Sequence, residues 1–422
     1  MLTSPSEQGK RIGPERAHLL RSAGAHGFAD GEAGSMLAAI LSAWLQYAAD
    51  GAPHARAVVT GTACPAASAD GRPLTMTVRA ERAPSFDDTV CDAAVESHAK
   101  HIRIGDRELP APARDPRTVV VLGDTGCRIN KVAAQACADP AEWPFPATAR
   151  SIAAVHPDLV VHVGDYLYRE NACPLLARCA GSPYGDAAAA WYADFLTPAA
   201  PIFASTPVVL VRGNHEECDR NGAGWFRYLD PRGSAACMDA TEPYAVDLGD
   251  LRIVAFDSAV AEDRKVSADR TAIYRRQFAE VGKLAARADD RPVRARPVPL
   301  ERWFVTHRPP YTNDDERSAM GDALAPFDAV LAGHIHFFGA MNVASMPPLL
   351  INGEGGTKLD PNYAPLLGLA IGDLHAEGRT FGSSHFGFAV YTRRGNDWSI
   401  SLRDVDGTER TRCTLANRTV RC

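Results

Sequence analysis

Short apolar runs, many of which end abruptly in a polar turn, recur along most of the chain. The run 118–122 ends in Gly-Asp-Thr-Gly, and the run 161–163 ends in Gly-Asp. Short runs rich in β-branched residues and closed by turn residues predict buried strands. The other strands predicted in this way are 207–212, 251–256, 303–306, 329–332, 348–351, 387–391 and 398–402.

Helical patterns separate several of these strands. A helical stretch is predicted around Ala147–Val155, and Tyr274, Phe278, Val281 and Ala285 recur at the spacing of one face of an amphipathic helix. Strands that alternate with helices, and that each end in a polar turn, indicate an α/β domain. In such a domain the site lies at the carboxyl ends of the strands.

The first part of the chain follows a different pattern. Residues 1–43 are rich in Gly, Ala, Arg and Ser without steady periodicity, so we expect a poorly ordered segment or a targeting region. Met36–Leu45 has the length and apolar character of the hydrophobic part of a signal peptide, but it lacks a basic segment directly upstream. One ordinary amphipathic helix packed on the main domain fits the same residues equally well.

Residues 44–108 show the pattern of short strands. Ala57–Thr60 and Leu74–Val78 are predicted strands, and Asp70-Gly71 is a turn signal between them. We expect a small β-rich accessory domain here. A stiff, proline-containing linker then leads to a large domain at 118–422.

Composition and charge argue against several classes of partner. The 422 residues are 46% apolar and 23% charged, which is ordinary for a soluble globular protein. The net charge is −6 and Lys and Arg form no run, so we expect no nucleic-acid partner. No apolar stretch reaches the roughly 18 residues of a membrane-spanning helix, so we expect no membrane partner either. The oligomeric state has no signature in the sequence.

The ten cysteines fall into five pairs of near neighbours along the chain. In order, the pairs are Cys64 with Cys91, Cys127 with Cys137, Cys173 with Cys179, Cys218 with Cys237, and Cys413 with Cys422. None forms a Cys-x-x-Cys pair, which argues against zinc-ribbon and thioredoxin-like sites. Five local disulfides fit this pattern, so we expect a secreted or periplasmic protein, although spacing leaves the connectivity open. The alternative is a cytosolic enzyme with ten reduced cysteines.

Five of the strand-ending turns carry side chains that bind metals in proteins. These side chains are Asp124, Asp165, Asn214, His307, His334 and His336. A single Gly-Asp turn means little, because Asp bends the chain cheaply. Five such turns in one domain supply a mixed set of nitrogen and oxygen ligands, which suits Fe, Zn or Mn better than a thiolate-bound metal.

In chain order these turns are Gly-Asp-Thr-Gly, Gly-Asp-Tyr-Leu-Tyr, Gly-Asn-His-Glu, Val-Thr-His and Gly-His-Ile-His. The series resembles the five blocks of the calcineurin-like metallophosphoesterases, over roughly residues 118–395, and is most similar to the purple acid phosphatase branch. Gly126 stands where most members have a metal-binding His, and Tyr168 follows three residues after Asp165. Both departures favour that branch. The resemblance implies an α/β fold, a four-layer α/β/β/α sandwich with metals at strand ends, here preceded by the small N-terminal β-rich domain.

The resemblance also implies the ligands of two metal ions. The first ion, Fe(III), would be held by Asp124, Asp165, Tyr168 and His336, with Tyr168 bound as a phenolate. The second ion, Fe, Zn or Mn, would share Asp165 and be completed by Asn214, His307 and His334. Two ions about 3.5–4 Å apart clamp a phosphoryl group and acidify a shared water.

The implied reaction is hydrolysis of a small phosphomonoester by a metal-bound hydroxide. His215 follows the Asn ligand directly, and by resemblance it faces the substrate, where a histidine can stabilise the developing charge or protonate the leaving group. Glu216 either orients His215 or is a solvated turn residue. Three alternatives stay open. They are a phosphodiesterase acting on a cyclic nucleotide, nucleic acid or phospholipid head group; a non-catalytic surface binding module; and a cytosolic Mn-dependent enzyme without Fe.

Overall fold

Three β-sheets organise the computed structural model, which describes residues 39–233, 236–286, 300–360, 370–371 and 374–422. The expectation for the segment 1–43 therefore falls almost entirely outside the described residues. Residues Ala38–Cys422 group into one compact unit.

The strands of the first sheet are β1 (Ile40–Tyr47), β2 (Pro53–Val59), β5 (Thr77–Ala80), β6 (Thr89–Ala94), β9 (Thr118–Leu122), β10 (Leu159–His162), β11 (Val208–Leu210), β20 (Gly387–Arg394), β21 (Asp397–Asp404), β22 (Glu409–Ala416) and β23 (Thr419–Arg421). Their order is β23-β22-β21-β20-β9-β10-β11-β1-β2-β6-β5. The second sheet contains β12 (Tyr244–Leu248), β13 (Leu251–Ala255), β14 (Glu301–Val305), β15 (Ala329–Ala332), β16 (Phe338–Val343), β17 (Leu349–Asn352), β18 (Ala370–Ile371) and β19 (Leu374–Ser383). Its order is β12-β13-β14-β15-β17-β16-β19-β18. A small third sheet pairs β3 (Ala67–Ala69), β4 (Arg72–Leu74), β7 (Ile102–Ile104) and β8 (Arg107–Leu109).

The helices in the described residues are α1 (Phe145–Val155), α2 (Leu176–Cys179), α3 (Ala188–Trp191), α4 (Ala200–Ser205), α5 (Gly222–Tyr228), α6 (Ala268–Ala286) and α7 (Asp314–Met320), with a π-helical turn η1 (Tyr192–Leu196) and a 3-10 turn η2 (Asn214–Glu216). Helices α1 and α6 match the two helices that the apolar spacing predicts. Helix α1 carries a proline in its first turn and ends at His156, which adopts a left-handed conformation that stops the helix.

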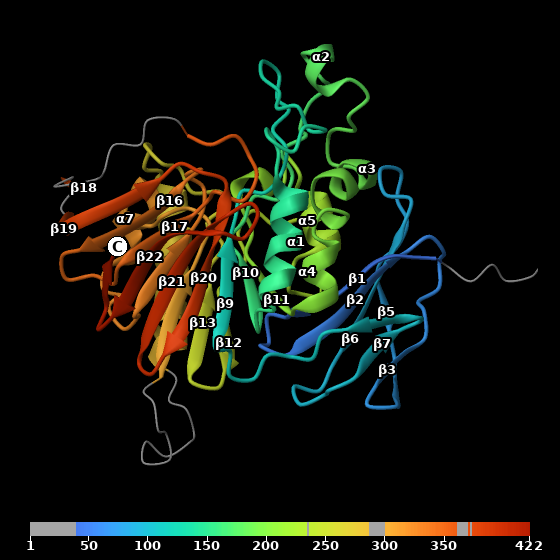
Figure 1. Ribbon diagram of the computed structural model, residues 1–422, viewed down its shortest axis with the longest axis horizontal. Coiled ribbons are helices and arrows are strands. Elements are labelled where there is room, and N and C mark those ends of the chain that lie inside the picture. Colours follow the sequence, from blue (N-terminus) through green and yellow to red (C-terminus); the bar gives the residue numbers. More distant parts are fainter. Residues whose placement is uncertain (1–38, 234–235, 287–299, 361–369, 372–373) are drawn as a thin grey trace, which may run out of the picture. The chain divides into compact units, whose positions relative to one another are not determined.

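Apolar side chains fill the space between the two large sheets and also cover both outer faces. Along β9, Val119 and Val121 face the other sheet, whereas Val120 and Leu122 face the helical layer that includes α1 and α4. On the second sheet, Phe304 packs with the α6 and α7 side chains while its neighbour Val305 faces the inter-sheet core. The order helix, sheet, sheet, helix confirms the predicted four-layer sandwich. Figure 1 shows the helical layer with α1 and α4 beside β9, β10 and β11.

Parallel strands at the centre of each sheet bring the predicted site loops to one edge. Strands β9, β10 and β11 are parallel, with Val161 paired to Val121 on one side and to Val209 on the other. Strands β13, β14, β15 and β17 are parallel in the second sheet. Because the strands of a parallel set end at a common edge, the loops that follow them are neighbours.

The N-terminal strands continue the first sheet. Strand β1 covers most of the segment 36–45, so the helix interpretation of that segment is wrong; Trp44 and Leu45 are fully buried. The strand pairs with β2 on one side and with β11 on the other, where Gln46 lies opposite Val208. Of the strands in the expected β-rich region 44–108, β2, β5 and β6 extend the same sheet, and the others form the small third sheet.

All five predicted cysteine pairs form disulfides: Cys64–Cys91, Cys127–Cys137, Cys173–Cys179, Cys218–Cys237 and Cys413–Cys422. Each closes a short loop, and none of these ten cysteines is free. In the part of the chain that the structure describes, no helix has the length and apolar character needed to cross a bilayer.

Candidate metal centre

The loops after β9, β10, β11, β14 and β15 bring the predicted ligands together. Asp124 follows β9, Asp165 and Tyr168 follow β10, Asn214 follows β11, His307 follows β14, and His334 and His336 follow β15. All of them are buried except His334, which is partly exposed. The structure therefore places every one of these side chains in the same region, inside the protein.

Three of these residues have left-handed backbone conformations. The φ angles are 56° at Asp124, 60° at Asp165 and 71° at His334. This conformation costs roughly 1–2 kcal/mol for an L-residue, and Asp, Asn and His tolerate it better than most. Strain of this kind at three neighbouring residues points to a functional site, because each sharp turn aims a side chain at the same place.

One half of the centre gathers around the Tyr168 phenol. Its oxygen lies 2.9 Å from Asp124 Oδ1, 2.7 Å from Asp165 Oδ2 and 3.1 Å from His336 Nε2. Burial, and then the two carboxylates, raise the pKa of the Tyr168 phenol above its ordinary value. Two carboxylates, a phenol and an imidazole form a donor set with the anionic oxygens that a highly charged metal ion requires.

The other half gathers around Asn214. Its Oδ1 atom lies 3.0 Å from His307 Nε2 and 2.9 Å from His334 Nδ1. Asp165 Oδ2 is 3.2 Å from His307 Nε2, so this carboxylate oxygen lies between the two halves. Ligand atoms of Asp124, Asp165 and His307 all lie within 4.8 Å of one another. The arrangement fits two ions that share Asp165.

Hydrogen bonds orient all three histidines with one ring nitrogen toward the centre. The remote nitrogen of His307 contacts the Val163 carbonyl oxygen at 2.8 Å, and that of His336 contacts the Lys358 carbonyl oxygen at 2.9 Å. The remote nitrogen of His334 lies 3.0 Å from an Asp263 carboxylate oxygen. Each remote nitrogen donates its proton to an acceptor, which leaves a lone pair on the inward nitrogen for a metal.

The buried carboxylates of the centre also favour the binding of cations. Burial, and then the nearby Asp165 carboxylate, raise the pKa of Asp124, whereas the imidazoles of His307 and His215 outweigh burial and lower the pKa of Asp165. Two buried carboxylates in contact through one phenol are costly without positive charge between them. Metal ions supply that charge, so the residues present fit the pair of ions that the sequence implies.

His215 packs directly on this centre. Its ring lies over the Tyr168 ring with centroids 3.8 Å apart, and its backbone amide donates to Asp165 Oδ1 at 2.9 Å. Nδ1 of His215 lies 3.1 Å from a Glu170 carboxylate oxygen, and Nε2 lies 3.8 Å from Asp165 Oδ2. The ring therefore turns Nε2 toward the metal ligands, while Nδ1 contacts the Glu170 carboxylate.

The carboxylate beside His215 belongs to Glu170, whereas the sequence leads us to expect Glu216 there. Glu216 is fully buried and accepts four backbone amides, those of Gly213, Asp165, Tyr166 and Leu167, at 2.9–3.2 Å. Burial, and then Asp165, raise the pKa of Glu216 to about 8. Its carboxylate ties the loop after β10 to the loop after β11, because the amides of both loops point at it.

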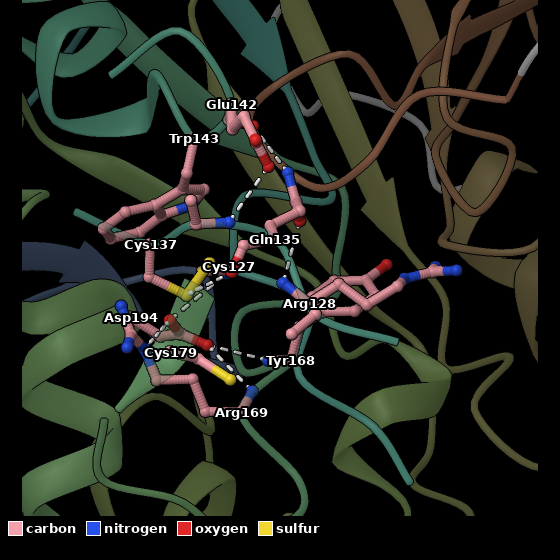
Figure 2. The surroundings of a disulfide bond; sticks show 12 residues. Cys127, Arg128, Gln135, Cys137, Glu142, Trp143, Tyr168, Arg169, Cys179 and Asp194 are labelled. Atoms are coloured by element: carbon pink, nitrogen blue, oxygen red, sulfur yellow. Dashed lines mark hydrogen bonds and ion pairs between the residues drawn. A yellow bond between two sulfur atoms is a disulfide. The ribbon is translucent and has the colours of Figure 1, made fainter. Parts of the chain in front are cut away.

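Several residues that position the centre carry no recognisable motif. Asp194 of η1 accepts the backbone amides of Cys127, Tyr168 and Arg169, and so fastens the first two ligand loops to each other (Figure 2). Glu170 contacts Nδ1 of His215, and Asp263 contacts Nε2 of His334, in each case the ring nitrogen that points away from the centre. These three acids lie in the segments between the motifs, and their sequence neighbourhoods contain no signal that distinguishes them from ordinary surface carboxylates.

Disulfides brace the loops around the centre. The bond Cys127–Cys137 lies three residues after Asp124 and beside Asp194 (Figure 2). The bonds Cys173–Cys179 and Cys218–Cys237 follow the second and third ligand turns. A braced rim limits the motion of the ligand loops and keeps their side chains in place.

Comparison with known proteins adds a family and a fold. A family model described as calcineurin-like phosphoesterase matches residues 117–338, which is more than half of the chain. A search of curated proteins found no match.

Solved structures resemble most of this chain at low sequence identity. Purple acid phosphatase PPD1 from yellow lupin (Lupinus luteus) seeds is 14% identical, with a TM-score of 0.53 over 90% of this chain and 74% of that one. The structure of PhoD is 12% identical, with a TM-score of 0.54 over 90% of this chain and 91% of that one. At these identities the likeness concerns the fold.

Proposed function

Because the chain belongs to the calcineurin-like phosphoesterase family, it is a metal-dependent hydrolase of phosphate esters with two metal ions, and we propose that its substrates are small phosphomonoesters. The observation that carries this proposal is the place of Asp165 Oδ2, 2.7 Å from the Tyr168 phenol and 3.2 Å from His307 Nε2. A carboxylate oxygen in that place belongs to both halves of the centre. The centre is therefore built for two ions side by side, the arrangement used for phosphoryl transfer to water.

We assign the ligands of the two ions as the sequence implies. Asp124, Asp165, Tyr168 and His336 hold the first ion. Asp165, Asn214, His307 and His334 hold the second. The phenol and the two carboxylates favour a trivalent ion, Fe(III), in the first position, and the nitrogen-rich second position suits Fe, Zn or Mn.

When bound, the ions supply Lewis acidity and a nucleophilic hydroxide at neutral pH. The protein supplies the proton for the leaving group. His215 turns Nε2 toward the centre, and its Nδ1 contacts Glu170, so the ring is held with one nitrogen available to the leaving alkoxide. General acid catalysis by such a group contributes roughly 10²- to 10⁴-fold to the rate. We propose His215 as the acid and Glu170, in place of Glu216, as the residue that orients it.

Five disulfides support a protein that works in an oxidising compartment, and we propose a secreted or periplasmic location. The same bonds predict that full activity requires non-reducing conditions, because three of them brace the rim of the centre.

Steady-state hydrolysis of p-nitrophenyl phosphate and of bis-p-nitrophenyl phosphate tests the reaction. We expect kcat/KM to be higher for the monoester. A clear preference for the bis-ester would make the protein a phosphodiesterase, and no hydrolysis of either by metal-loaded protein would remove the proposal.

Elemental analysis combined with the visible spectrum tests the metals. We expect two ions per chain and, with Fe(III) on the phenolate, a charge-transfer band that Tyr168→Phe abolishes. His215→Ala should lower kcat while it leaves the metal content unchanged. An unchanged spectrum in Tyr168→Phe would exclude the phenolate ligand, and loss of metal in His215→Ala would make His215 a ligand.

A further inference from the structure

Among the described residues, three arginines lie against the metal centre, and two of them form an ion pair with a carboxylate. Arg220 pairs with Glu170 at 2.6 Å, and Arg308 pairs with Asp263 at 2.8 Å. For Arg128, the described residues offer no carboxylate within ion-pair distance. Within the part of the chain that the structure describes, Arg128 therefore brings to the centre a positive charge that has no ion-pair partner.

The guanidinium of Arg128 lies over the Tyr168 and His336 half of the centre. Its central carbon is 5.4 Å from the centroid of the Tyr168 ring, and one terminal nitrogen is 3.5 Å from His336 Nδ1. That nitrogen of His336 donates its proton to the Lys358 carbonyl oxygen, so it has no lone pair to offer Arg128. Among the described residues, no other side-chain acceptor contacts this partly exposed guanidinium, so its donors stay available to a ligand.

The backbone that carries Arg128 is fixed from several sides. Its amide donates to Gln135 Oε1 at 2.8 Å (Figure 2). The preceding residue, Cys127, is in a disulfide and donates its amide to Asp194, and the following residue, Ile129, donates its amide to the Tyr168 carbonyl oxygen at 2.9 Å. Because the backbone at Arg128 is already ordered, binding costs little further conformational entropy there, and a contact made by the side chain retains most of its binding energy.

We propose that Arg128 is a substrate-binding residue that contacts the phosphoryl group and selects monoesters over diesters. The inference rests on the proposed function, since it names the feature of the substrate that the centre recognises. A phosphomonoester has three terminal oxygens and carries close to two negative charges at neutral pH, whereas a diester has two terminal oxygens and one charge. If the metal ions take two terminal oxygens, a monoester keeps a third charged oxygen for the guanidinium, whereas a diester keeps none.

The test compares Arg128→Met, Arg128→Lys and the control Lys131→Met. Lys131 is an exposed cation three residues further along the same loop, so its loss changes the charge of the loop equally. We measure kcat/KM for p-nitrophenyl phosphate and for bis-p-nitrophenyl phosphate, the inhibition constant of inorganic phosphate, and the metal content. Arg128→Met should lower kcat/KM for the monoester by about 10- to 100-fold, the range for a charge-assisted pair of hydrogen bonds, and should raise the phosphate inhibition constant similarly.

The diester should lose less than about threefold in Arg128→Met, and Arg128→Lys should recover part of the monoester rate because it keeps the charge without the fork. Equal losses for both esters, no loss for either, or the same loss in Lys131→Met would overturn the inference. So would a loss of bound metal in Arg128→Met, because the residue would then act on the ligands.

Failure of the inference and failure of the proposed function give different results. If the wild-type protein prefers diesters while Arg128→Met still lowers the monoester rate selectively, the monoester proposal fails and the assignment of Arg128 holds. If the wild-type protein hydrolyses neither ester, calorimetric titration of the metal-loaded protein with inorganic phosphate decides. Weaker phosphate binding in Arg128→Met than in Lys131→Met then supports the contact, and equal binding refutes it.

Discussion

Replacing Asp263 with Asn should weaken the binding of one of the two metal ions and leave the other unaffected. One Asp263 oxygen lies 3.0 Å from the remote nitrogen of His334, and the other lies 2.8 Å from Arg308. A carboxylate accepts from both partners. The amide of Asn accepts with one atom only, so either His334 or Arg308 meets a donor group that repels its own N–H.

The size of the effect follows from the role of the carboxylate. It fixes the His334 tautomer with the proton on the remote nitrogen, which leaves the inward nitrogen, 2.9 Å from Asn214 Oδ1, free for the metal. Loss of such an outer contact typically lowers metal affinity by about 10- to 100-fold, which corresponds to about 1.4–2.7 kcal/mol. The ion that we assign to Tyr168 and His336 should keep its affinity, because Asp263 contacts His334 and Arg308 rather than those two residues.

The assay is a titration of metal-free protein with Zn²⁺ or Mn²⁺ against a chelator, which resolves two successive dissociation constants. Only one of the two should rise in Asp263→Asn. Glu262→Gln removes the same charge from the exposed neighbouring residue and serves as the control, with both constants unchanged. If both constants rose together, or neither did, Asp263 would not position His334 and the orientation of that ligand would need another explanation.

Glu216→Asp keeps the carboxyl group but withdraws it from four backbone amides, so denaturant unfolding should show a loss of about 2–4 kcal/mol. Unchanged stability with lower kcat would instead give Glu216 a catalytic role. Burial, and then Asp328, raise the pKa of Glu301 to about 7. Because the folded pKa of Glu301 exceeds its unfolded value, the folded protein loses stability as the pH rises from the unfolded pKa to the folded pKa. Glu301→Gln should therefore raise the free energy of unfolding by up to about 3 kcal/mol at pH 8 and by almost nothing at pH 4. A gain that is constant with pH would contradict this. Replacing both Cys218 and Cys237, which close a loop with a sequence separation of 19, should cost about 3 kcal/mol in denaturant unfolding.

The Glu216 change and the cysteine change each have a control in the same chain. Glu217 is the partly exposed neighbour of Glu216, and Glu217→Gln should change the free energy of unfolding by less than about 0.5 kcal/mol. Replacing Cys218 and Cys237 should also lower the metal content, because this bond braces the rim of the centre. Replacing Cys413 and Cys422, far along the chain from the ligand loops, should lower stability by a similar amount without altering the metal content. Equal metal loss in the two cysteine variants would mean that neither bond acts through the rim of the centre.

The ligand turns could be predicted from the sequence because their signal is local. Asp124, Asp165 and Asn214 each follow a buried parallel strand closely, and a polar residue in that place is visible in the pattern. The disulfides were equally accessible, since each joins near neighbours in the chain. Where the partner cysteine is close in the chain, the spacing alone reduces the number of plausible disulfide pairings.

Features that depend on distant partners could not be predicted in this way. An apolar run such as 36–45 fits a helix as well as a strand, and only the pairing of Gln46 with Val208 decides in favour of the strand. The carboxylate of Glu216 reaches amides of a loop about fifty residues earlier in the chain, and the contact with His215 comes from that same earlier loop, from Glu170. Neither relation leaves a trace in local spacing.

The pairing of β1 with β11 also governs which pieces of this chain stay soluble on their own. A chain shortened to the matched family region, 117–338, would lose β1 and leave β11 as an exposed edge strand. Val208–Leu210 is almost fully buried in the full sheet, and an uncovered apolar edge of this kind pairs readily with other chains. The N-terminal strands thus guard the sheet against aggregation, and recombinant fragments should begin before residue 40.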